Sequence, residues 1–239
     1  MKASIIIPAM NEERSIGLVL DEIPRDDVAE VIVVDNGSTD GTADVARARG
    51  ATVVEEKRTG YGAACLKGIA SLGSTSEIVV ILDGDHSDYP EDLTLLLAPI
   101  KNGQADFVIG SRVAGAAERG ALKWNQRFGN ALACGMIRRL YGFRFSDMGP
   151  FRAIRRRSLE QLGMRDPTFG WNAEMQVKAI RHGLRIIEVP VRYRKRIGKS
   201  KISGTIKGTI LAGVKIIGTI LLYYPAYLRS RRGSVRSRV

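Results

Sequence analysis

Cysteine and histidine are both scarce in this chain of 239 residues, which contains two of each. Cys65 and Cys134 lie far apart in segments with helical spacing, and neither has a histidine or another cysteine at the spacing of a metal site. The sequence therefore gives no indication of a disulfide framework, and a reducing compartment is favoured. The chain enters a predicted strand within its first residues, which leaves no room for a signal peptide, so we expect a cytoplasmic protein.

Acidic residues are absent from the C-terminal end, because the segment from Val189 to Val239 holds 13 Lys and Arg but no Asp or Glu. The whole chain has 37 basic and 25 acidic residues, so residues 1–188 are nearly neutral and the net charge of +12 arises at this end. Such a distribution favours an anionic partner for that end alone, such as a membrane surface. Aromatic residues do not alternate with the basic residues after Leu228, so we expect no nucleic acid as the partner.

Strand-like and helix-like patterns alternate through the first half of the chain. Strands are predicted at Ser4–Ile7, Val31–Val34, Thr52–Glu55, Ile78–Leu82 and Phe107–Ile109, and helices at residues 12–23, 40–49, 61–72 and 90–101. This order predicts an α/β fold with a mostly parallel central sheet and helices on both faces. The length fits a single domain with a sizeable core.

Asp83-Gly84-Asp85 follows directly on the apolar run Ile78–Leu82, which has the pattern of a buried strand. Residues i and i+2 of an extended segment point the same way, so the two carboxylates face one spot. Like charges that close repel each other unless a proton or a cation lies between them. Such a pair suits Mg²⁺ or Mn²⁺, which complete their coordination with water and substrate phosphates. The alternative is an acidic turn that caps the helix beginning near Pro90.

Polar residues also follow the first two predicted strands, at Pro8-Ala9-Met10-Asn11-Glu12 and at residues 35–42. Ligands of open α/β sheets bind outside the carboxyl ends of the strands, so three such loops on one edge predict a binding site. The first two loops could instead only cap helices, although a cap has no need of Asp35. A dinucleotide site at Gly60-Tyr61-Gly62 is disfavoured, because the third glycine of that motif is missing and the segment follows the third strand.

Together these segments resemble the family 2 inverting glycosyltransferases of the GT-A nucleotide-sugar fold. Within that family they are most similar to the polyprenyl-phosphate glycosyl synthases, such as the dolichyl-phosphate mannose and glucose synthases. The resemblance covers roughly residues 3–201, and its motifs are weak singly but specific in their order and spacing. It is carried by Pro8-Ala9-Met10-Asn11-Glu12, Asp35-x-Gly-Ser-x-Asp40-Gly-Thr, Gly60-Tyr61-Gly62-Ala63-Ala64, Asp83-Gly-Asp85, Gly110-Ser111-Arg112, Asp147-Met-Gly-Pro-Phe-Arg152, Trp171-Asn-Ala-Glu174-Met175 and Arg196-Ile-Gly198-Lys199-Ser200-Lys201.

The resemblance implies a donor site at the strand ends. Its nucleotide-sugar-binding residues would be Pro8, Ala9, Asn11, Glu12, Asp35, Gly62, Asp83, Gly84 and Asp85, with Asp83 and Asp85 also holding Mg²⁺ or Mn²⁺. The phosphates of donor or acceptor would be bound by Arg112, Arg152, Arg196, Ser200 and Lys201. His86 is left as a candidate metal ligand. The likeness of the segments 60–64 and 147–152 to glucosyl-type members favours a UDP-sugar over a GDP-sugar.

The acceptor decides whether the reaction needs a general base. Sugar transfer builds negative charge on the departing diphosphate, which a cation and Arg112 would stabilise. A phosphomonoester acceptor has a second pKa of about 6 and attacks without losing a proton. A hydroxyl acceptor needs a base, for which Asp147 and Glu174 are the catalytic candidates. Asp147 could instead pair with Arg144 or Arg152, and Glu174 could be a solvated helix position.

The segment from Ile202 to Leu228 is apolar and is followed by five arginines. Residues 208–226 contain one charge, Lys215, so a transmembrane span is one alternative. A central lysine costs about 2.5–3.5 kcal/mol on insertion, and together with Pro225 it favours an amphipathic helix in the membrane interface. We therefore expect a glycosyltransferase domain at residues 1–201 and a membrane-surface helix with a basic tail at residues 202–239. Docking of this helix on its own domain or on a membrane-protein partner is the third alternative.

Three functional hypotheses follow. The leading one is transfer of a hexose from a nucleoside-diphosphate sugar to a polyprenyl phosphate, by a peripheral enzyme at the cytoplasmic face of the membrane. The second keeps the donor and replaces the acceptor by a soluble hydroxyl compound. The third is a basic module that binds membrane or nucleic acid without catalysis, although such a module has no use for Asp83 and Asp85.

Overall fold

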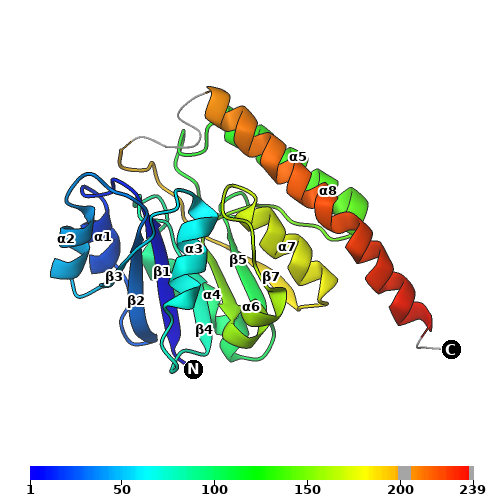
Figure 1. Cartoon of the computed structure of the whole chain (residues 1–239), viewed down its shortest axis with the longest axis horizontal. Helices are drawn as coiled ribbons and strands as arrows, with labels where there is room; N and C mark the ends of the chain where they lie inside the picture. The colour runs from blue at the N-terminus through cyan, green and yellow to red at the C-terminus, as the bar shows by residue number, and fades with distance from the viewer. Residues whose placement is uncertain (199–205, 237–239) are drawn as a thin grey trace.

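The computed structural model describes residues 1–198 and 206–236 of the chain (Figure 1). The strands in this part are β1 (Ala3–Ala9), β2 (Val28–Asp35), β3 (Thr52–Glu55), β4 (Ile78–Ile81), β5 (Phe107–Ser111), β6 (Arg152–Arg155) and β7 (Ile186–Pro190). The helices are α1 (Ile16–Asp21), α2 (Thr42–Ala48), α3 (Tyr61–Ala70), α4 (Leu93–Lys101) after the 3₁₀ turn η1 (Pro90–Asp92), α5 (Trp124–Tyr141), α6 (Arg156–Leu162), α7 (Trp171–Arg181) and α8 (Ile206–Arg236).

The seven strands form one sheet in the order β3-β2-β1-β4-β6-β5-β7. All neighbouring pairs are parallel except those of β6, which runs antiparallel to β4 and β5. Ala9 at the end of β1 pairs with Asp35 at the end of β2, and Ile6 pairs with Ile81 at the end of β4. The loops after these three strands therefore leave the same edge of the sheet, and the predicted α/β fold is confirmed.

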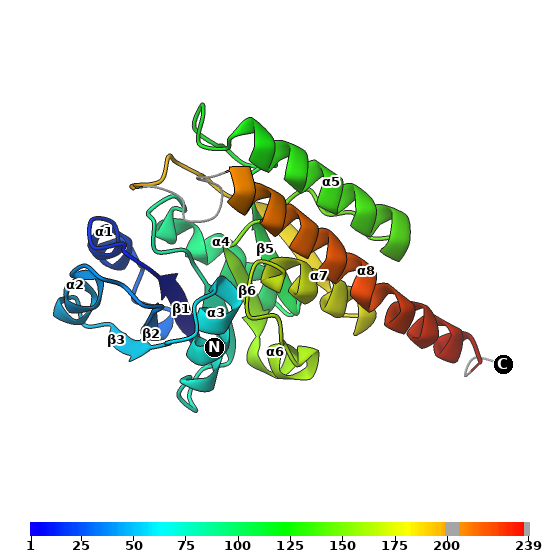
Figure 2. The same cartoon turned by 45° about the horizontal axis from the view of Figure 1, so that its top comes forward.

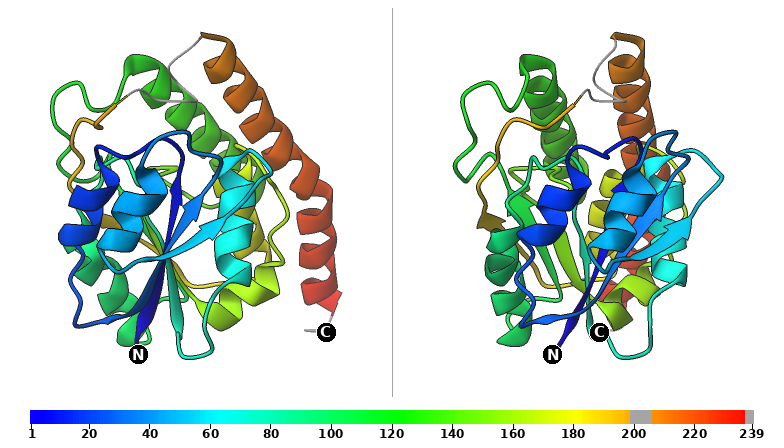
Figure 3. Two further views of the ribbon diagram at one scale, coloured as in Figure 1. Left: turned by 60° about the vertical axis from the view of Figure 1, so that its left-hand side comes forward. Right: turned by 90° about the vertical axis from the view of Figure 1, so that its left-hand side faces the viewer.

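The two faces of the sheet are covered by different helices (Figure 3). Successive side chains of a strand point to opposite faces, so Ile6 joins the core beneath α3, α6 and α7, whereas Ile5 and Ile7 join the core beneath α1, α2 and α4. The helix expected at residues 12–23 begins only at Ile16, because Asn11 has a positive φ of 53° and the chain makes a loop first.

Helices α5 and α8 lie side by side in an outer layer on the face of α7 (Figure 2). The Tyr141 hydroxyl of α5 donates to the carbonyl of Ile220 (2.6 Å), and the Tyr227 hydroxyl donates to the carbonyl of Tyr141 (2.7 Å). Ile220 and Tyr227 are buried, whereas other apolar side chains of α8 are exposed. From Ile210 to Arg229, α8 is long and apolar enough to cross a membrane, by length and composition only. One side of α8 is thus docked on the domain, and the domain boundary expected after residue 201 stays a prediction.

Candidate active site

Asp83 and Asp85 lie in the floor of a cavity of about 330 Å³ at the carboxyl edge of the sheet. The cavity is an open pocket lined mainly by the ends of β1 and β4, the start of α3 and the segment after β7. Its lining residues are Pro8, Ala9, Met10, Glu12, Asn36, Thr59, Gly60, Tyr61, Ala64, Asp83, Gly84, Asp85, Phe169 and Arg196. Seven residues predicted for donor or phosphate binding are therefore brought together here, and we call this space the donor cavity.

Asp83 is half-buried, and its buried Oδ1 atom has no hydrogen-bond partner in the described part of the chain. Burial raises the pKa of Asp83 to about 7, the nearby charge of Asp85 adds to this rise, and Arg196 and Arg112 oppose it. The hydroxyl of Tyr61 lies beside this carboxyl without a hydrogen bond of normal geometry, and burial raises its pKa as well. A buried carboxylate oxygen without a partner calls for an explanation, and a bound ion at this carboxylate would supply one.

Asp85 is held in place from two sides. Its Oδ1 atom accepts hydrogen bonds from the Ser87 backbone N–H (3.0 Å) and hydroxyl (2.5 Å). Its Oδ2 atom lies 3.1 Å from a guanidinium nitrogen of Arg196, which also contacts Oε1 of Glu12 at 3.2 Å. Arg196 therefore joins the loops after β1 and β4, with a cationic group on the wall of the donor cavity.

The two carboxylates fit a divalent cation that takes its other ligands from outside the protein. In residues 1–198 and 206–236, no group of three or more His, Cys, Asp and Glu side chains is arranged to hold a metal ion. Mg²⁺ and Mn²⁺ typically use one or two carboxylates together with water and substrate phosphates, which matches Asp83 and Asp85. His86 does not join them, because its Nε2 atom lies 2.9 Å from Oε1 of Glu22.

Three predicted donor residues shape the loops and do not line the cavity. The Asn11 side chain accepts a hydrogen bond from the Thr39 N–H (2.7 Å), and Asp35 accepts one from the Ser38 N–H (2.9 Å). Gly62 lies against the loop after α6, where a Cβ atom would be 2.0 Å from a carbonyl oxygen. These contacts hold the walls of the site, and nucleotide binding by the three residues stays a prediction.

Sequence reasoning missed Asn36 and Phe169 of the donor cavity. The Asn36 amide donates to the carbonyls of Glu56 (2.9 Å) and Arg58 (2.8 Å) and accepts from the Gly60 N–H (2.8 Å). Its position next to Asp35 in a predicted site loop was the available signal. Phe169 comes from a distant loop with no motif, so no sequence pattern points to it.

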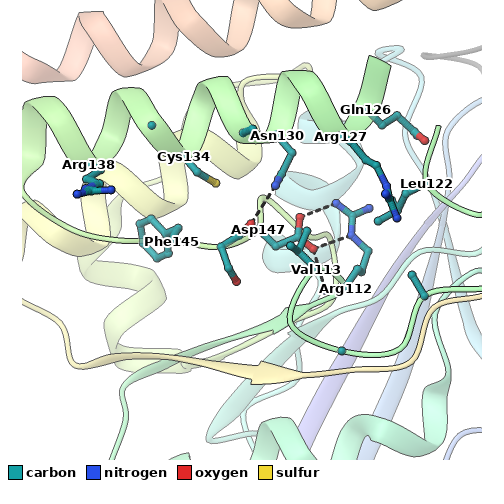
Figure 4. Close-up of a pocket in the computed structure, with 15 residues that line it drawn as sticks. Arg112, Val113, Leu122, Gln126, Arg127, Asn130, Cys134, Arg138, Phe145 and Asp147 are labelled. Atoms are coloured by element: carbon teal, nitrogen blue, oxygen red, sulfur yellow. Dashed lines mark hydrogen bonds and ion pairs between the residues drawn. The ribbon is translucent and has the colours of Figure 1, made fainter. Parts of the chain in front are cut away.

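A second and larger cavity of about 620 Å³ lies between α5, the loop after β5 and the loop before β6 (Figure 4). At its inner end, two nitrogens of the Arg112 guanidinium donate to the two carboxylate oxygens of Asp147, each at 2.8 Å. The Arg112 backbone N–H donates to the same carboxylate. Although burial alone would lower it, the hydrogen bonds with Asp147 raise the pKa of Arg112, so the guanidinium stays charged.

Helix α5 supplies Arg127, Asn130 and Arg138 to this second cavity, none of which was predicted. Asn130 anchors the opposite loop, since it donates to the carbonyl of Ser146 (2.9 Å) and accepts from the Met148 N–H (2.7 Å). Apolar side chains complete the lining, among them Val113, Leu122, Cys134 and Phe145. The cavity thus combines guanidinium groups with an apolar wall.

The remaining predicted residues occupy other places. Asp147 pairs with Arg112, so both alternative partners considered for it, Arg144 and Arg152, were wrong. Arg152 is buried beneath the site and donates to the carbonyls of Gly149 (2.8 Å) and Asn172 (3.1 Å), and burial lowers its pKa to about 10. It lines neither cavity. Ser200 and Lys201 lie outside the described residues.

Glu174 is fully buried on α7, which excludes the alternative of a solvated helix position. Its carboxylate accepts hydrogen bonds from the backbone N–H groups of Arg165 (3.0 Å) and Asp166 (2.7 Å) and from the hydroxyl of Tyr223 (2.7 Å). It also pairs with Lys178 at 2.7 Å. Because it lines neither cavity, its role as a catalytic base stays a prediction that these contacts do not favour.

Comparison with known proteins identifies the family. Residues 4–163 match the model of glycosyl transferase family 2. The chain is 40% identical over 212 residues to an uncharacterised glycosyltransferase of Mycobacterium tuberculosis, covering 87% of this chain and 93% of that protein. It is 32% identical over 233 residues to the undecaprenyl-phosphate mannosyltransferase of Micrococcus luteus, covering 90% and 93% of the two chains.

A solved structure shares the fold across most of its length. It is the glucosyl-3-phosphoglycerate synthase of Mycobacterium tuberculosis in complex with Mn²⁺, UDP-glucose and phosphoglyceric acid, with a TM-score of 0.71 and 25% identity. The match covers 92% of this chain and 78% of that one. The predicted resemblance is confirmed: the chain belongs to glycosyl transferase family 2 and is a hexosyltransferase of the GT-A fold.

Proposed function

We propose that this chain transfers a hexose from a UDP-sugar to the phosphate of a polyprenyl phosphate, as a peripheral enzyme on the cytoplasmic face of a membrane. The similarity to an undecaprenyl-phosphate mannosyltransferase supports the acceptor class. The complex of the structural neighbour with Mn²⁺ and UDP-glucose supports the donor and a divalent metal.

The larger cavity is the observation that carries this proposal. Arg112, Arg127 and Arg138 offer guanidinium groups there, and guanidinium forks bind phosphate oxygens in pairs. Val113, Leu122 and Phe145 provide an apolar wall in the same space. A lipid phosphate joins an anionic group directly to an apolar chain, so it matches both parts of the lining. We call this space the acceptor cavity.

The residues of the two cavities divide the chemistry between them. Asp83 and Asp85 would hold Mg²⁺ or Mn²⁺, which supplies positive charge against the departing diphosphate. Arg196 presents a second cation to the diphosphate from the wall of the donor cavity. Arg112 of the acceptor cavity is near enough to Asp83 for its charge to oppose the rise in the pKa of Asp83. Because the acceptor phosphate is ionised, Asp147 need only orient Arg112.

An apolar surface on the outer layer supports the membrane location. Trp124, Phe128 and Leu132 recur every four residues along α5 and are exposed, with 80% of the Trp124 surface accessible. Exposed residues of α8 add to this surface, namely Ile210, Leu211, Val214, Leu221 and Leu222. Large exposed apolar patches mark sites of protein or membrane contact. We call this set the outer face and propose that it contacts an anionic bilayer.

A soluble phosphorylated acceptor is the second candidate. It is favoured by the structural neighbour, which was solved with phosphoglyceric acid. Such an acceptor would use the guanidinium groups of the acceptor cavity and leave its apolar wall unused.

Transfer assays with a panel of UDP-sugars and Mn²⁺ separate the two candidates. We expect product with undecaprenyl phosphate and with short prenyl phosphates, and none with the matching prenyl alcohols or with phosphoglycerate. Arg138→Gln is expected to raise the acceptor KM by about tenfold, the cost of one charge-assisted hydrogen bond. The control Arg139→Gln changes the same charge next to it but lines neither cavity, so it should act like the wild type. Turnover of phosphoglycerate alone would reject the lipid acceptor.

Trp124 provides a direct probe of the outer face, because Trp171, the other tryptophan, is fully buried. Mixing the protein with anionic vesicles should shift the tryptophan emission to shorter wavelength, and brominated lipids should quench it. The same change should be lost in Trp124→Phe while Trp171 still emits. A wild-type spectrum that is unaffected by anionic vesicles would contradict membrane contact through α5.

A further inference from the structure

The loop between α6 and α7 (residues 163–170, the α6–α7 loop) forms part of the support of the donor cavity. The Pro167 carbonyl accepts a hydrogen bond from the Ala63 N–H at the start of α3 (2.8 Å). A Cβ atom on Gly60 would lie 2.3 Å from this carbonyl oxygen, so the loop presses directly on the chain that lines the cavity. Phe169 of the same loop lines the cavity itself. A shift of the loop must therefore change the shape of the donor cavity.

The other side of the α6–α7 loop is held by α8. Lys215 of α8 forms an ion pair with Asp166 at 2.9 Å. A Cβ atom on Gly170 would lie 2.4 Å from the Thr219 hydroxyl, so helix and loop are in close contact there. Tyr223 reaches the loop through Glu174, whose carboxylate binds the Tyr223 hydroxyl and the N–H of Asp166, each at 2.7 Å.

These three α8 residues lie on one face of the helix. Positions 215, 219 and 223 are four residues apart, and side chains at this spacing are neighbours on a helix surface. Ile210, Val214 and Leu221, in contrast, lie on the opposite side of the helix and are exposed members of the outer face. One helix therefore presents an apolar surface to the surroundings and a row of polar contacts to the α6–α7 loop.

We infer that α8 positions the α6–α7 loop and thereby sets the nucleotide affinity of the donor cavity, and we call this role of α8 the strut. Because α8 also carries part of the outer face, donor binding is then linked to contact of the outer face with the membrane. The inference rests on the proposed function for the identity of the donor and the membrane. Tyr223 and Lys215 are positioning residues in this arrangement, and Glu174 transmits the contact from α8 to the loop. Because coupling between two sites is reciprocal, bound nucleotide in turn stabilises the docked state of α8.

Nucleotide binding to the whole chain tests the strut without an activity assay. With Mn²⁺ present, Tyr223→Phe is expected to weaken UDP binding in calorimetry by about fivefold or more, in the range of coupling between sites. Tyr224→Phe is the matched control, since it removes a hydroxyl from the next residue, whose ring packs on Tyr141. Anionic vesicles should tighten UDP binding to the wild type and to the control, and this gain should disappear in Tyr223→Phe.

Variants at Lys215 show whether the effect of Tyr223→Phe arises only from altered packing around Tyr223. Lys215→Met should weaken UDP binding, and Lys215→Arg should restore it because the ion pair with Asp166 can form again. Equal UDP affinity in Tyr223→Phe, Tyr224→Phe and Lys215→Met would overturn the strut. A wild-type chain that does not bind UDP with Mn²⁺ would instead reject the proposed donor. A chain that binds UDP but glycosylates only phosphoglycerate would reject the lipid acceptor.

Discussion

Asp83→Asn is expected to remove Mn²⁺-dependent donor binding and at the same time to make the metal-free protein more stable. The asparagine loses the charge that a divalent cation requires, so we expect transfer to fall about 100- to 1,000-fold, as when a group that stabilises the departing charge is removed. The gain in stability follows from the Asp83 carboxyl, whose buried Oδ1 atom has no partner in the described part of the chain. Asp83 would thus destabilise the fold when no cation is bound, as residues kept for function often do.

The stability gain has a defined pH dependence. The pKa of Asp83 is about 7 in the folded chain, against about 3.9 for an aspartate in an unfolded chain. The folded state therefore favours the protonated form, so this residue destabilises the fold progressively as the pH rises from about 4 to 7. Asp83→Asn should raise the free energy of unfolding by about 2–4 kcal/mol at pH 8, since one pKa unit corresponds to about 1.4 kcal/mol, and by almost nothing near pH 4.

Asp85→Asn is the matched control for this stability effect. Neutralising Asp85 relieves its repulsion with Asp83 but also removes its ion pair with Arg196, so this variant should gain less stability at pH 8 than Asp83→Asn. Urea denaturation of the two variants with EDTA, at pH 4, 6 and 8, checks these expectations. If Asp83→Asn lowers the free energy of unfolding at pH 8, the orphaned carboxyl is not a source of instability.

Asp147→Asn is expected to destabilise the fold more than neutralising an exposed carboxylate does. It leaves the largely buried guanidinium of Arg112 without its carboxylate partner. Removing one partner of a buried ion pair costs about 3–5 kcal/mol. In a domain of this size, that loss lowers the Tm by about 10 °C. Replacing both residues, by Arg112→Met with Asp147→Asn, should cost less than the sum of the single changes, which a double-mutant cycle measures. Asp44→Asn, in an exposed pair with Arg47, should cost less than about 1 kcal/mol.

The same variant separates two roles of Asp147 in the reaction. If Asp147 only orients Arg112, then Asp147→Asn mainly raises the KM for the phosphate acceptor and retains a measurable kcat. If Asp147 is a general base, kcat is lost and the KM changes little. Steady-state kinetics at 15 °C, where the variant is folded, distinguish the two results. A complete loss of kcat with undecaprenyl phosphate would contradict the orienting role.

The sheet and the pair of aspartates at its edge could be predicted because their signals are local. Apolar runs such as Ile78–Leu82 mark buried strands, and the residues after them must lie at one edge once the strands are parallel. The strand β6 escaped prediction, because Arg152–Arg155 begins and ends with arginine and is short. Its charged ends are accommodated by carbonyl oxygens, as for Arg152, and such partners are not visible in the sequence.

The acceptor cavity could not be predicted because it depends on contacts between distant segments. Asp147 pairs with Arg112, 35 residues away, whereas sequence reasoning considered arginines nearer in the chain. Arg138 and Asn130 have ordinary helical surroundings in the sequence, and only the packing of α5 over the loop before β6 places them in the cavity lining. Glu174 was predicted as a catalytic residue from its charge and its motif. A carboxylate can equally accept hydrogen bonds from the N–H groups of a neighbouring loop, as Glu174 does.

The reversed direction of β6 has a consequence for how this protein family can diversify. In a wholly parallel sheet, only the segments that follow a strand lie at the edge where ligands bind. The chain must then cross back to the opposite edge, usually through a helix, before the next strand begins. Because β6 is antiparallel to β5, the segment before β6 lies at the same edge of the sheet as the segment after β5. Asp147 of the first segment therefore pairs with Arg112 of the second. Changes in the length of that incoming segment can remodel the proposed acceptor side while the loops after β1, β2 and β4, which we propose hold the donor, stay unchanged.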